Sequence, residues 1–272
     1  MAKILVTHIN PHLDDIAAIW LFKKFSPDWK NAKTRFISAE QGHSGLEDDE
    51  NTLHIGVGRG KYDEHKGDVG ESAMSLVWKD IKEKGLGPKD EFEEKALDEM
   101  TRWNTLIDTA SLPIGEFDEY MVDGFIRSRK NDPVDSLKTI ELGTEILERI
   151  LPNIIKKQKG LVDWEKRIEF KSRWGKSVAV ESDFVSQEFA YKDGYQVIII
   201  KGPTRKFIGI FAPGTSDVDL TPVYLKITEI DPESGWYIHH AKKMILCGSS
   251  SAPNVKRSNL TLQQVIDVVK NA

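Results

Sequence analysis

The first fifteen residues constrain most strongly what this chain can fold into. An apolar run over residues 4–6 leads into a polar turn, and an apolar helical pattern over residues 16–25 follows at once. In open α/β sheets, active sites are built in this kind of turn, outside the carboxyl end of a strand. The turn contains four potential metal ligands, which are His8, His12, Asp14 and Asp15.

The composition is that of a globular protein with room for a large core. The chain has 272 residues, of which 39% are hydrophobic and 30% charged, and this length predicts two domains. The net charge of −5 gives no overall field that favours nucleic acid, although a local basic groove stays open. The sequence shows no signal peptide and no apolar run of the roughly 18 residues that a membrane span needs. The single cysteine, Cys247, excludes an internal disulfide and a cysteine-based zinc site, and we expect a cytoplasmic protein without membrane contact.

Short apolar runs alternate with helical patterns in the first part of the chain. The predicted strands cover residues 3–7, 34–38 and 52–57. The predicted helices cover residues 16–25, 72–84, 90–110, 118–129 and 135–155. Because such alternation is typical of α/β proteins, we expect residues 1–155 to form an α/β domain around a mostly parallel sheet.

The pattern changes in the second part of the chain. Residues 156–175 are rich in charges of both signs, which favours a solvated linker helix over a nucleic-acid-binding arm. Residues 176–272 are interpreted as a smaller α+β domain that ends in a helix over residues 260–270, capped by Thr261. Its predicted strands cover residues 177–180, 195–200, 207–211 and 223–227, with 236–247 as a further candidate.

The spacing His8-x3-His12-x-Asp14-Asp15 combines imidazole and carboxylate groups within eight residues. Such mixed sets suit Mn, Fe, Zn or Co, and Mn is favoured where carboxylates dominate. The alternative is a polar turn in which Asp14 or Asp15 caps the following helix. The density of such residues directly after an apolar strand favours the metal site.

Two later positions extend this set. Asp63, Glu64 and His65 follow the strand predicted over residues 52–57, and Asp108 follows an apolar pair in a long helical pattern. His54 is interpreted either as a ligand or as a core histidine with satisfied hydrogen bonds. His43, in a Gly-containing loop, is expected to be solvated.

Taken together, residues 7–15, 56–58 and 62–65 and Asp108 resemble the DHH phosphoesterase superfamily, and within it the MYG1-related branch. The resemblance covers most of the chain. It implies an α/β catalytic domain and a smaller C-terminal domain that contributes substrate contacts across a cleft. Members are Mn-dependent phosphodiesterases, nucleases or pyrophosphatases, and the MYG1-related branch is associated with 3′–5′ exonuclease activity.

The resemblance also implies roles for individual residues. The implied metal ligands are His8, His12, Asp14, Asp63, Glu64 and Asp108. His65 and Asp15 are the implied catalytic residues, and the cofactor is one or two Mn²⁺ ions, with Mg²⁺, Co²⁺ or Zn²⁺ as alternatives. Two positions depart from the family pattern, because Gly56 stands where a metal-bridging Asp is usual and Glu64 stands where the first His of the motif is usual.

The C-terminal part contains a Gly- and Ser-rich turn followed by two basic residues. Such a turn can present backbone N–H groups and hydroxyls to a phosphate, and an adjacent guanidinium adds a planar fork. The alternative is a Ser-rich hairpin loop without a ligand. The residues assigned to substrate binding by the resemblance are His239, His240, Gly248, Ser249, Ser250, Lys256 and Arg257.

These features favour a metal-dependent phosphoester hydrolase that acts on a phosphate-containing small molecule, such as a nucleotide, or on short single-stranded nucleic acid. An exonuclease would use aromatic and basic residues along a groove, which the stretch from Trp164 to Trp174 contains unless it is a packed linker. A phosphatase or pyrophosphatase for small substrates is the alternative enzyme. Outside enzymes, Gly56 and Glu64 favour a non-catalytic nucleotide- and metal-binding sensor with a degenerate site.

Overall fold

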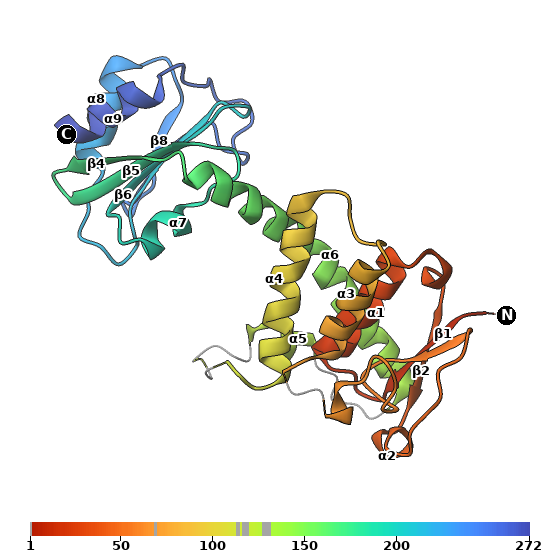
Figure 1. The fold of residues 1–272 in the computed structure, drawn as a ribbon. Coiled ribbons are helices and arrows are strands. Elements are labelled where there is room, and N and C mark those ends of the chain that lie inside the picture. The colour runs from red at the N-terminus through yellow and green to blue at the C-terminus, as the bar shows by residue number, and fades with distance from the viewer. Residues whose placement is uncertain (1, 68–69, 113–114, 116–119, 127–131) are drawn as a thin grey trace. The chain divides into compact units, whose positions relative to one another are not determined.

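The computed structural model describes residues 2–67, 70–112, 115, 120–126 and 132–272. The chain forms two compact units, Met1–Ile155 and Lys156–Ala272 (Figure 1). The helix predicted over residues 118–129 lies partly outside the described residues, and α5, Val122–Ile126, is the part of it that the structure describes.

A three-stranded parallel sheet forms the base of the first unit. Its strands lie in the order β2-β1-β3, with β1 at Ile4–His8, β2 at Lys33–Ile37 and β3 at Thr52–His54. Both outer strands run parallel to β1, so the carboxyl ends of all three strands meet at one edge. The turns that follow β1 and β3 therefore come together at that edge, as the prediction of a parallel α/β sheet requires.

Helices pack on this sheet and share one core with it. The main helices are α1 (Leu13–Phe25), α3 (Ala73–Glu83), α4 (Glu91–Asp108) and α6 (Pro133–Trp164). Figure 1 shows α1, α3 and α4 to one side of the sheet. Residues 13–22 of α1 are all buried, so α1 is a central helix and not an amphipathic surface helix. This burial fixes the first turn of α1, which carries the predicted ligands, against the rest of the unit.

Two short elements complete the edge of the sheet where the strands end. A four-residue helix, α2, covers Ala39–Gly42, directly before His43, which was expected to lie in a loop. Its N-cap is Ser38, whose hydroxyl accepts a hydrogen bond from the backbone N–H of Gln41. A 3₁₀ turn, η2, covers Glu64–Lys66 and contains part of the predicted Asp63–His65 cluster.

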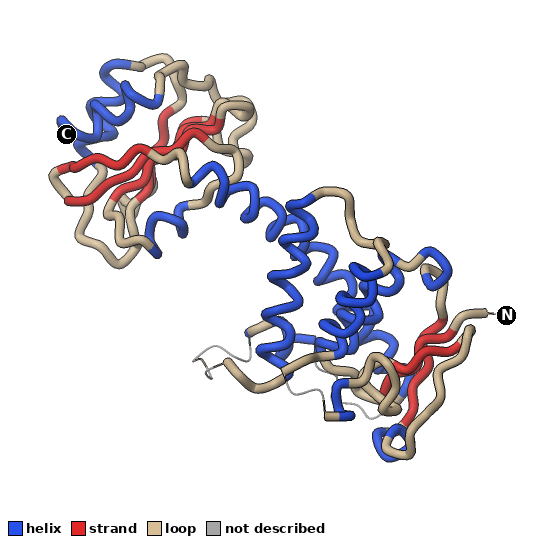
Figure 2. Tube along the Cα trace, in the orientation of Figure 1, coloured by secondary structure: helices blue, strands red, loops and turns tan. Residues whose placement is uncertain are grey.

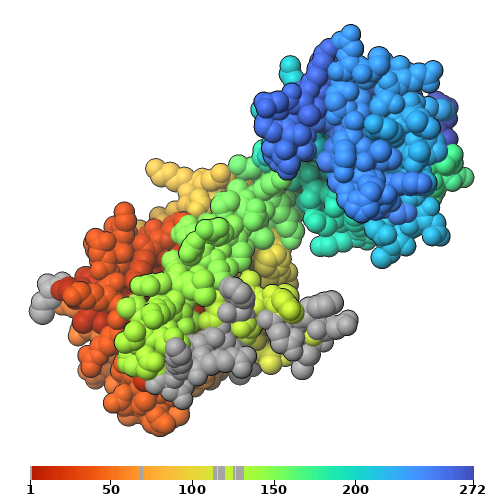
Figure 3. Space-filling model, turned by 180° about the vertical axis from the view of Figure 1, so that it is seen from behind, coloured from red at the N-terminus to blue at the C-terminus, as the bar shows by residue number. Residues whose placement is uncertain are grey.

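Helix α6 is longer than the sequence predicts. It continues through Pro152 to Trp164, where the prediction ended one helix near Ile155 and assigned residues 156–175 to a separate linker helix. Good helix formers on both sides sustain the helix although Pro152 cannot donate a backbone hydrogen bond. Figure 3 shows the first part of α6, in light green, on the surface of the first unit. Neither α6 nor any other described helix is long and apolar enough to cross a membrane.

The expected linker helix was also wrong for its second half, which forms strand β4 at Ile168–Ser172. β4 pairs antiparallel with β5, Gly175–Glu181, so that Ser172 lies opposite Gly175. β4 is an edge strand of its sheet, and charged side chains at an edge discourage pairing with another chain. Of the mixed charges that suggested a solvated helix, those of Glu169 and Lys171 therefore lie on a protected sheet edge, while those of residues 156–163 belong to α6.

The second unit contains one six-stranded sheet in the order β4-β5-β6-β7-β9-β8. All neighbouring strands are antiparallel except β5 and β6. The remaining strands are β6 (Val197–Gly202), β7 (Phe207–Phe211), β8 (Trp236–Ile238) and β9 (Met244–Cys247). Separate hydrophobic cores lie on the two faces of this sheet. Helices α8 (Thr221–Ile230) and α9 (Leu262–Asn271) pack on one face, and the end of α6 packs with α7 (Gln187–Lys192) on the other (Figure 2). These two sheets confirm the predicted fold class.

One predicted strand of the second unit is a helix. Residues 223–227 lie in α8, Thr221–Ile230, although their β-branched and aromatic composition favours a strand. Pro222 stands in the first turn, where a helix does not need its missing N–H. Val223 and Ile227, four residues apart, are both fully buried, which is the spacing of a helical face. The last helix, α9 at Leu262–Asn271, begins at the predicted cap Thr261.

Candidate metal centre

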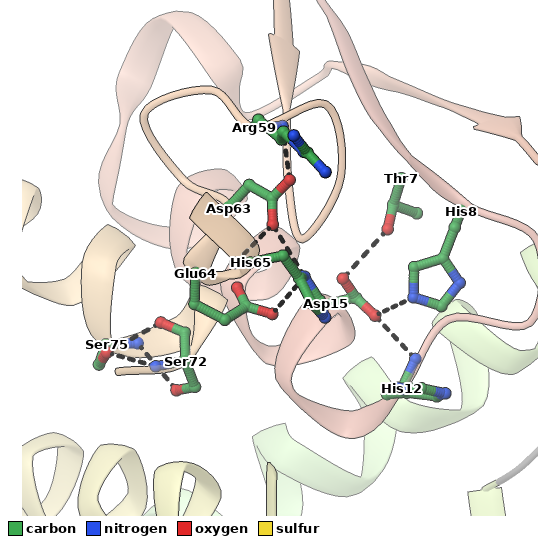
Figure 4. Close-up of polar contacts among 10 residues, drawn as sticks. All are labelled: Thr7, His8, His12, Asp15, Arg59, Asp63, Glu64, His65, Ser72 and Ser75. Carbon is green, nitrogen blue, oxygen red and sulfur yellow. Dashed lines mark hydrogen bonds and ion pairs between the residues drawn. The ribbon is translucent and has the colours of Figure 1, made fainter. Parts of the chain in front are cut away.

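Strand β1 and the first turn of α1 place the first group of candidate residues. Asp15 is 2% exposed, and its Oδ2 atom lies 3.0 Å from Nε2 of His8. The same oxygen accepts a hydrogen bond of 2.8 Å from the backbone N–H of His12, and Oδ1 accepts one of 3.3 Å from the hydroxyl of Thr7. Asp15 therefore both closes the first turn of α1 and fixes the ring of His8 (Figure 4).

The turn after β3 places the second group. Asp63 is 2% exposed and begins η2, with Oδ1 accepting hydrogen bonds from the backbone N–H of His65, at 3.0 Å, and from its Nδ1, at 2.8 Å. Its Oδ2 accepts a hydrogen bond of 2.6 Å from the backbone N–H of Arg59. Because both oxygens are occupied, Asp63 orients its neighbours in this structure. Because Nδ1 of His65 is bound to Asp63, the other ring nitrogen, Nε2, points away from Asp63.

Helix α4 contributes the third part, because its last residue is Asp108. Three groups of possible ligands result, in each of which the ligand atoms lie within 4.8 Å of one another. They are His8 with His12 and Asp15, Asp63 with Glu64 and His65, and Asp14 with Glu64 and Asp108. Glu64 belongs to two groups, and Asp14 and Asp15 are neighbours in the first turn of α1, so the three groups lie together at one edge of the sheet. Asp15, and not Asp14, lies with the two histidines.

The acids at this edge repel one another. Burial, followed by the charges of Asp15, Asp108 and Glu64, raises the pKa of Asp14 well above its usual range. Burial also raises the pKa of Glu64 to about 7, and the nearby charge of Asp15 adds to the effect. The pKa of Asp108 is raised by burial and then by Asp15. Carboxylates arranged in this way favour either protons or a cation.

The pair of His8 and Asp15 behaves in the opposite way. Burial by itself would lower the pKa of His8, but the hydrogen bond to Asp15 and the charge of that carboxylate raise it to about 9. Burial would likewise raise the pKa of Asp15, but the same contact with His8 lowers it. The two residues thus form an ion pair when no other cation is present.

The donor set fits a divalent cation. Oδ- and Oε-type oxygens from three acids meet beside two imidazoles, which is a set that Mn²⁺ and similar ions accept. The Oε2 atom of Glu64 is buried and has no hydrogen-bond partner. A buried carboxylate oxygen without a partner is costly, and a cation between Asp14, Glu64 and Asp108 would remove that cost.

Two cavities open on this group of residues. The first has a volume of about 520 Å³ and is lined in part by His8, His12, Arg59 and His65. The second has a volume of about 240 Å³, and its lining includes His12, Asp14, Asn104 and Asp108. His12 lines both cavities, His8 and His65 face the larger space, and Asp14 and Asp108 face the smaller one.

Two further polar residues that line these cavities, Asn104 and Arg59, were not among the predicted site residues. Asn104 is 5% exposed, its Oδ1 atom is buried without a hydrogen-bond partner, and it precedes Asp108 by one turn of α4. The i, i+4 spacing from Asp108 was the available signal. Arg59 lines the larger cavity, but nothing in its local sequence distinguishes it from a residue in a surface turn.

The structure explains the departure from the family pattern at Gly56. Its φ is +61°, a conformation that favours glycine, and a Cβ atom there would collide with Oδ1 of Asp15. No aspartate fits at this position while Asp15 holds its place. His54, 7% exposed, binds Oδ1 of Asp48 through its backbone N–H at 2.8 Å and Nδ1 at 2.9 Å, and no ligand group found among the described residues includes it. His43 is exposed, as expected.

The residues predicted to bind substrate in the second unit divide into two sets. Gly248 follows β9, and the guanidinium of Arg257 packs directly on it, with its Nη1 atom buried and without a hydrogen-bond partner. The Lys256 ammonium forms an ion pair with Glu233. His239 and His240, with ring centroids 4.0 Å apart, lie in the turn at the other end of the β8–β9 hairpin. Ser249 and Ser250 follow Gly248 in the chain and belong to its end of the hairpin.

The aromatic residues of the expected linker do not line a common groove. Trp164 is 6% exposed, packs with Tyr195 on one face of the six-stranded sheet, and donates a hydrogen bond of 3.1 Å to Asp193. Trp174 packs against the core on the opposite face. The two indole rings are therefore parts of separate cores, as the alternative of a packed segment predicted.

Comparison with known proteins gives weak likenesses only. No protein-family model and no curated protein matches the chain. A pGpG-specific phosphodiesterase, PggH from Vibrio cholerae, is 13% identical over 92% of this chain and 94% of its own, with a TM-score of 0.35. An uncharacterized Helicobacter pylori protein is 10% identical over 100% of both chains, with a TM-score of 0.27. RecJ from Thermus thermophilus, solved with Mg²⁺, is 8% identical over 99% of this chain and 49% of its own, with a TM-score of 0.31. At these values the likenesses assign no function.

Proposed function

We propose that this chain is a metal-dependent phosphoester hydrolase of the DHH type, with Mn²⁺ as the preferred ion and a nucleotide or short oligonucleotide as substrate. One observation carries this proposal. Asp14, Glu64 and Asp108 come from three separate elements and each place an oxygen within 4.8 Å of the others, and Oε2 of Glu64 is buried without a hydrogen-bond partner. Such clusters of acids with raised pKa are typical of functional sites and are costly in a purely structural role.

The cation site consists of Asp14, Glu64 and Asp108, with His8 and His12 beside them. A divalent cation held there would lower the pKa of a water molecule and polarise phosphoryl oxygens. Asp15 contacts the ring of His8 and the backbone at the start of α1, and so fixes the histidines relative to the acids of the site. Asp15 points at His8 and not at the other acids. These contacts satisfy its buried carboxylate and give it a supporting role.

His65 is the proposed general acid. Burial would lower its pKa, but the hydrogen bond from its Nδ1 to Asp63 and the charges of Glu64 and Asp63 raise it. The raised pKa extends the pH range in which this imidazole carries a proton, and its Nε2–H can donate that proton to a leaving oxygen. The ring is 70% exposed, which leaves that nitrogen accessible to a substrate.

The test compares Asp14→Asn with wild type and with Asp28→Asn, which removes an exposed acid from the same unit. We expect wild type and Asp28→Asn to bind Mn²⁺ in calorimetry and to hydrolyse bis(p-nitrophenyl) phosphate, while Asp14→Asn does neither with an unchanged circular dichroism spectrum. Equal turnover by Asp14→Asn and wild type would refute the site. A ladder of products from a 5′-labelled single-stranded oligonucleotide supports the 3′–5′ exonuclease, and cleavage of mononucleotides or pyrophosphate alone supports the small-substrate enzyme.

A second candidate function is a nucleotide- and metal-binding sensor without turnover. The observation in its favour is Gly56, because the contact with Asp15 leaves no space there for the carboxylate expected in the family. A catalytically weakened centre could retain Mn²⁺ and a phosphate ligand. Stoichiometric Mn²⁺ and nucleotide binding, with no hydrolysis of any phosphoester tested, supports the sensor and contradicts the hydrolase.

A further inference from the structure

Arg59 has a backbone conformation that does not suit an arginine. Its φ is +55°, in the left-handed region, and it stands between Gly58 and Gly60. Glycine adopts this conformation at little cost, whereas a side chain with a Cβ atom is strained there. Strain of this kind persists where the surrounding structure imposes it, and it is found preferentially at functional positions.

A buried acid holds Arg59 in this conformation. Oδ2 of Asp63 accepts the backbone N–H of Arg59 at 2.6 Å, while Oδ1 accepts the N–H and Nδ1 of His65. The backbone around it is fixed further, because the N–H of Gly56 donates to the carbonyl of Tyr62 at 2.9 Å. The position of Arg59 is thus tied to that of the proposed general acid by a single carboxylate.

The side chain of Arg59 is exposed and lines the cavity of about 520 Å³. Among the described residues its guanidinium has no ion-pair or hydrogen-bond partner, although it lies beside an acidic centre. In Figure 4 it extends from beside Asp63 toward the side of the site that contains Thr7 and His8. An unpaired guanidinium is the group best suited to bind two oxygens of one phosphate.

From these observations we propose that Arg59 binds a phosphate group of the substrate, and that the cavity accepts a mononucleotide-sized molecule or the terminal nucleotide of a chain. Its volume lies within the roughly 300–1,000 Å³ of small-molecule sites. This inference rests on the proposed phosphoester chemistry and extends it, because Arg59 belongs to none of the ligand groups. A glycine at position 59 would avoid the backbone strain and make the fold more stable, but it would place no cation in the cavity.

The test uses Arg59→Gly, which removes the guanidinium and also relieves the backbone strain. Calorimetry with adenosine 5′-monophosphate, inorganic phosphate and uncharged adenosine reports binding to the full-length protein in the presence of Mn²⁺. We expect Arg59→Gly to bind the monophosphate at least about tenfold more weakly, as the loss of a charge-assisted hydrogen bond predicts, and to bind adenosine as wild type does. Its thermal midpoint is expected to equal or exceed that of wild type.

Two further variants separate the phosphate contact from general charge effects. Arg59→Lys keeps the charge but not the planar fork, so we expect intermediate affinity. Arg102→Ala removes an exposed cation from α4, outside this cavity, and is expected to leave binding unchanged. Wild-type affinity in Arg59→Gly, or equal losses in Arg59→Gly and Arg102→Ala, overturns the inference.

The readouts distinguish this inference from the proposed hydrolysis. If wild type binds the monophosphate through Arg59 but hydrolyses no phosphoester, the inference stands and the hydrolase fails. If wild type hydrolyses phosphodiesters and Arg59→Gly retains its KM and kcat, the hydrolase stands and the inference fails. Wild-type protein that binds neither monophosphate nor inorganic phosphate also overturns the inference.

Discussion

Replacing Glu64 by Gln should make the metal-free protein more stable at neutral and higher pH. Glu64 keeps a buried oxygen without a partner, and its pKa is raised from 4.5 to about 7. A rise of this size means that the charged form of this carboxyl is disfavoured by about 3 kcal/mol in the folded state. Glutamine is isosteric and carries no charge, so it removes this penalty.

The sign of the pH dependence follows from proton linkage. Between about pH 4.5 and 7 the folded protein keeps a proton on Glu64 that the unfolded chain releases, so rising pH lowers the free energy of unfolding over this range. Without metal, wild type should lose up to ~3 kcal/mol across this interval from this residue alone. Glu64→Gln should not show this decrease in the free energy of unfolding, and the two proteins should have similar stability near pH 4.5.

The assay is urea unfolding at pH 4.5 and 8 in EDTA, and again at pH 8 with saturating MnCl₂. Hydrogen exchange of peptides from α1 reports on the first unit separately, since the two units need not unfold together. Free Mn²⁺ at 100 times its Kd should raise the free energy of unfolding of wild type by about 2.7 kcal/mol, and it should raise that of the variant much less. A Gln variant less stable than wild type at pH 8 in EDTA would refute our account of the acids.

Three further predictions address neighbouring residues. Asp15→Asn should lower the pKa of His8 from about 9 toward 6.5, as read from NMR titration of the ring. The stability supplied by that contact is present below about pH 6.5 and is lost as pH rises through 9, so the variant's deficit should shrink at high pH. Gly56→Ala should destabilise the protein by ~1–3 kcal/mol in urea unfolding, because it adds a Cβ atom at positive φ against Asp15, and an unchanged midpoint would contradict the packing described. Asp63→Asn should lower the pKa of His65, so the fall in rate on the alkaline side of any pH–rate profile should move to lower pH, while an unshifted profile would remove Asp63 from its orienting role.

The start of the fold and site was predictable because its signals are local. An apolar strand followed by ligands and a helical pattern requires only short-range rules, and β1 and α1 confirm it. The different partners of Asp14 and Asp15 were not predictable from such local rules. Neighbouring residues on a helix point about 100° apart, so two adjacent acids face different partners. Which one faces His8 depends on how α1 sits on the sheet.

The features that were mispredicted or missed depend on distant contacts. The strand predicted over residues 223–227 became α8 because burial at i and i+4 outweighs β propensity. Residues 168–172 became β4 because β5 offers an edge on which to pair. Asn104 and Arg59 belong to no motif, and only the folded chain brings them to the cavities at the sheet edge.

The bonding of the loop from Gly56 to His65 has a consequence for the thermodynamics of ligand binding. Asp63 ties Arg59 and His65 together, and the N–H of Leu46 donates to the carbonyl of Gly58 at 2.8 Å. A loop fixed at these points before the ligand arrives is preorganised and loses little backbone entropy when it binds. We therefore expect association without slow loop closure, with an entropy change dominated by the ligand and by released water.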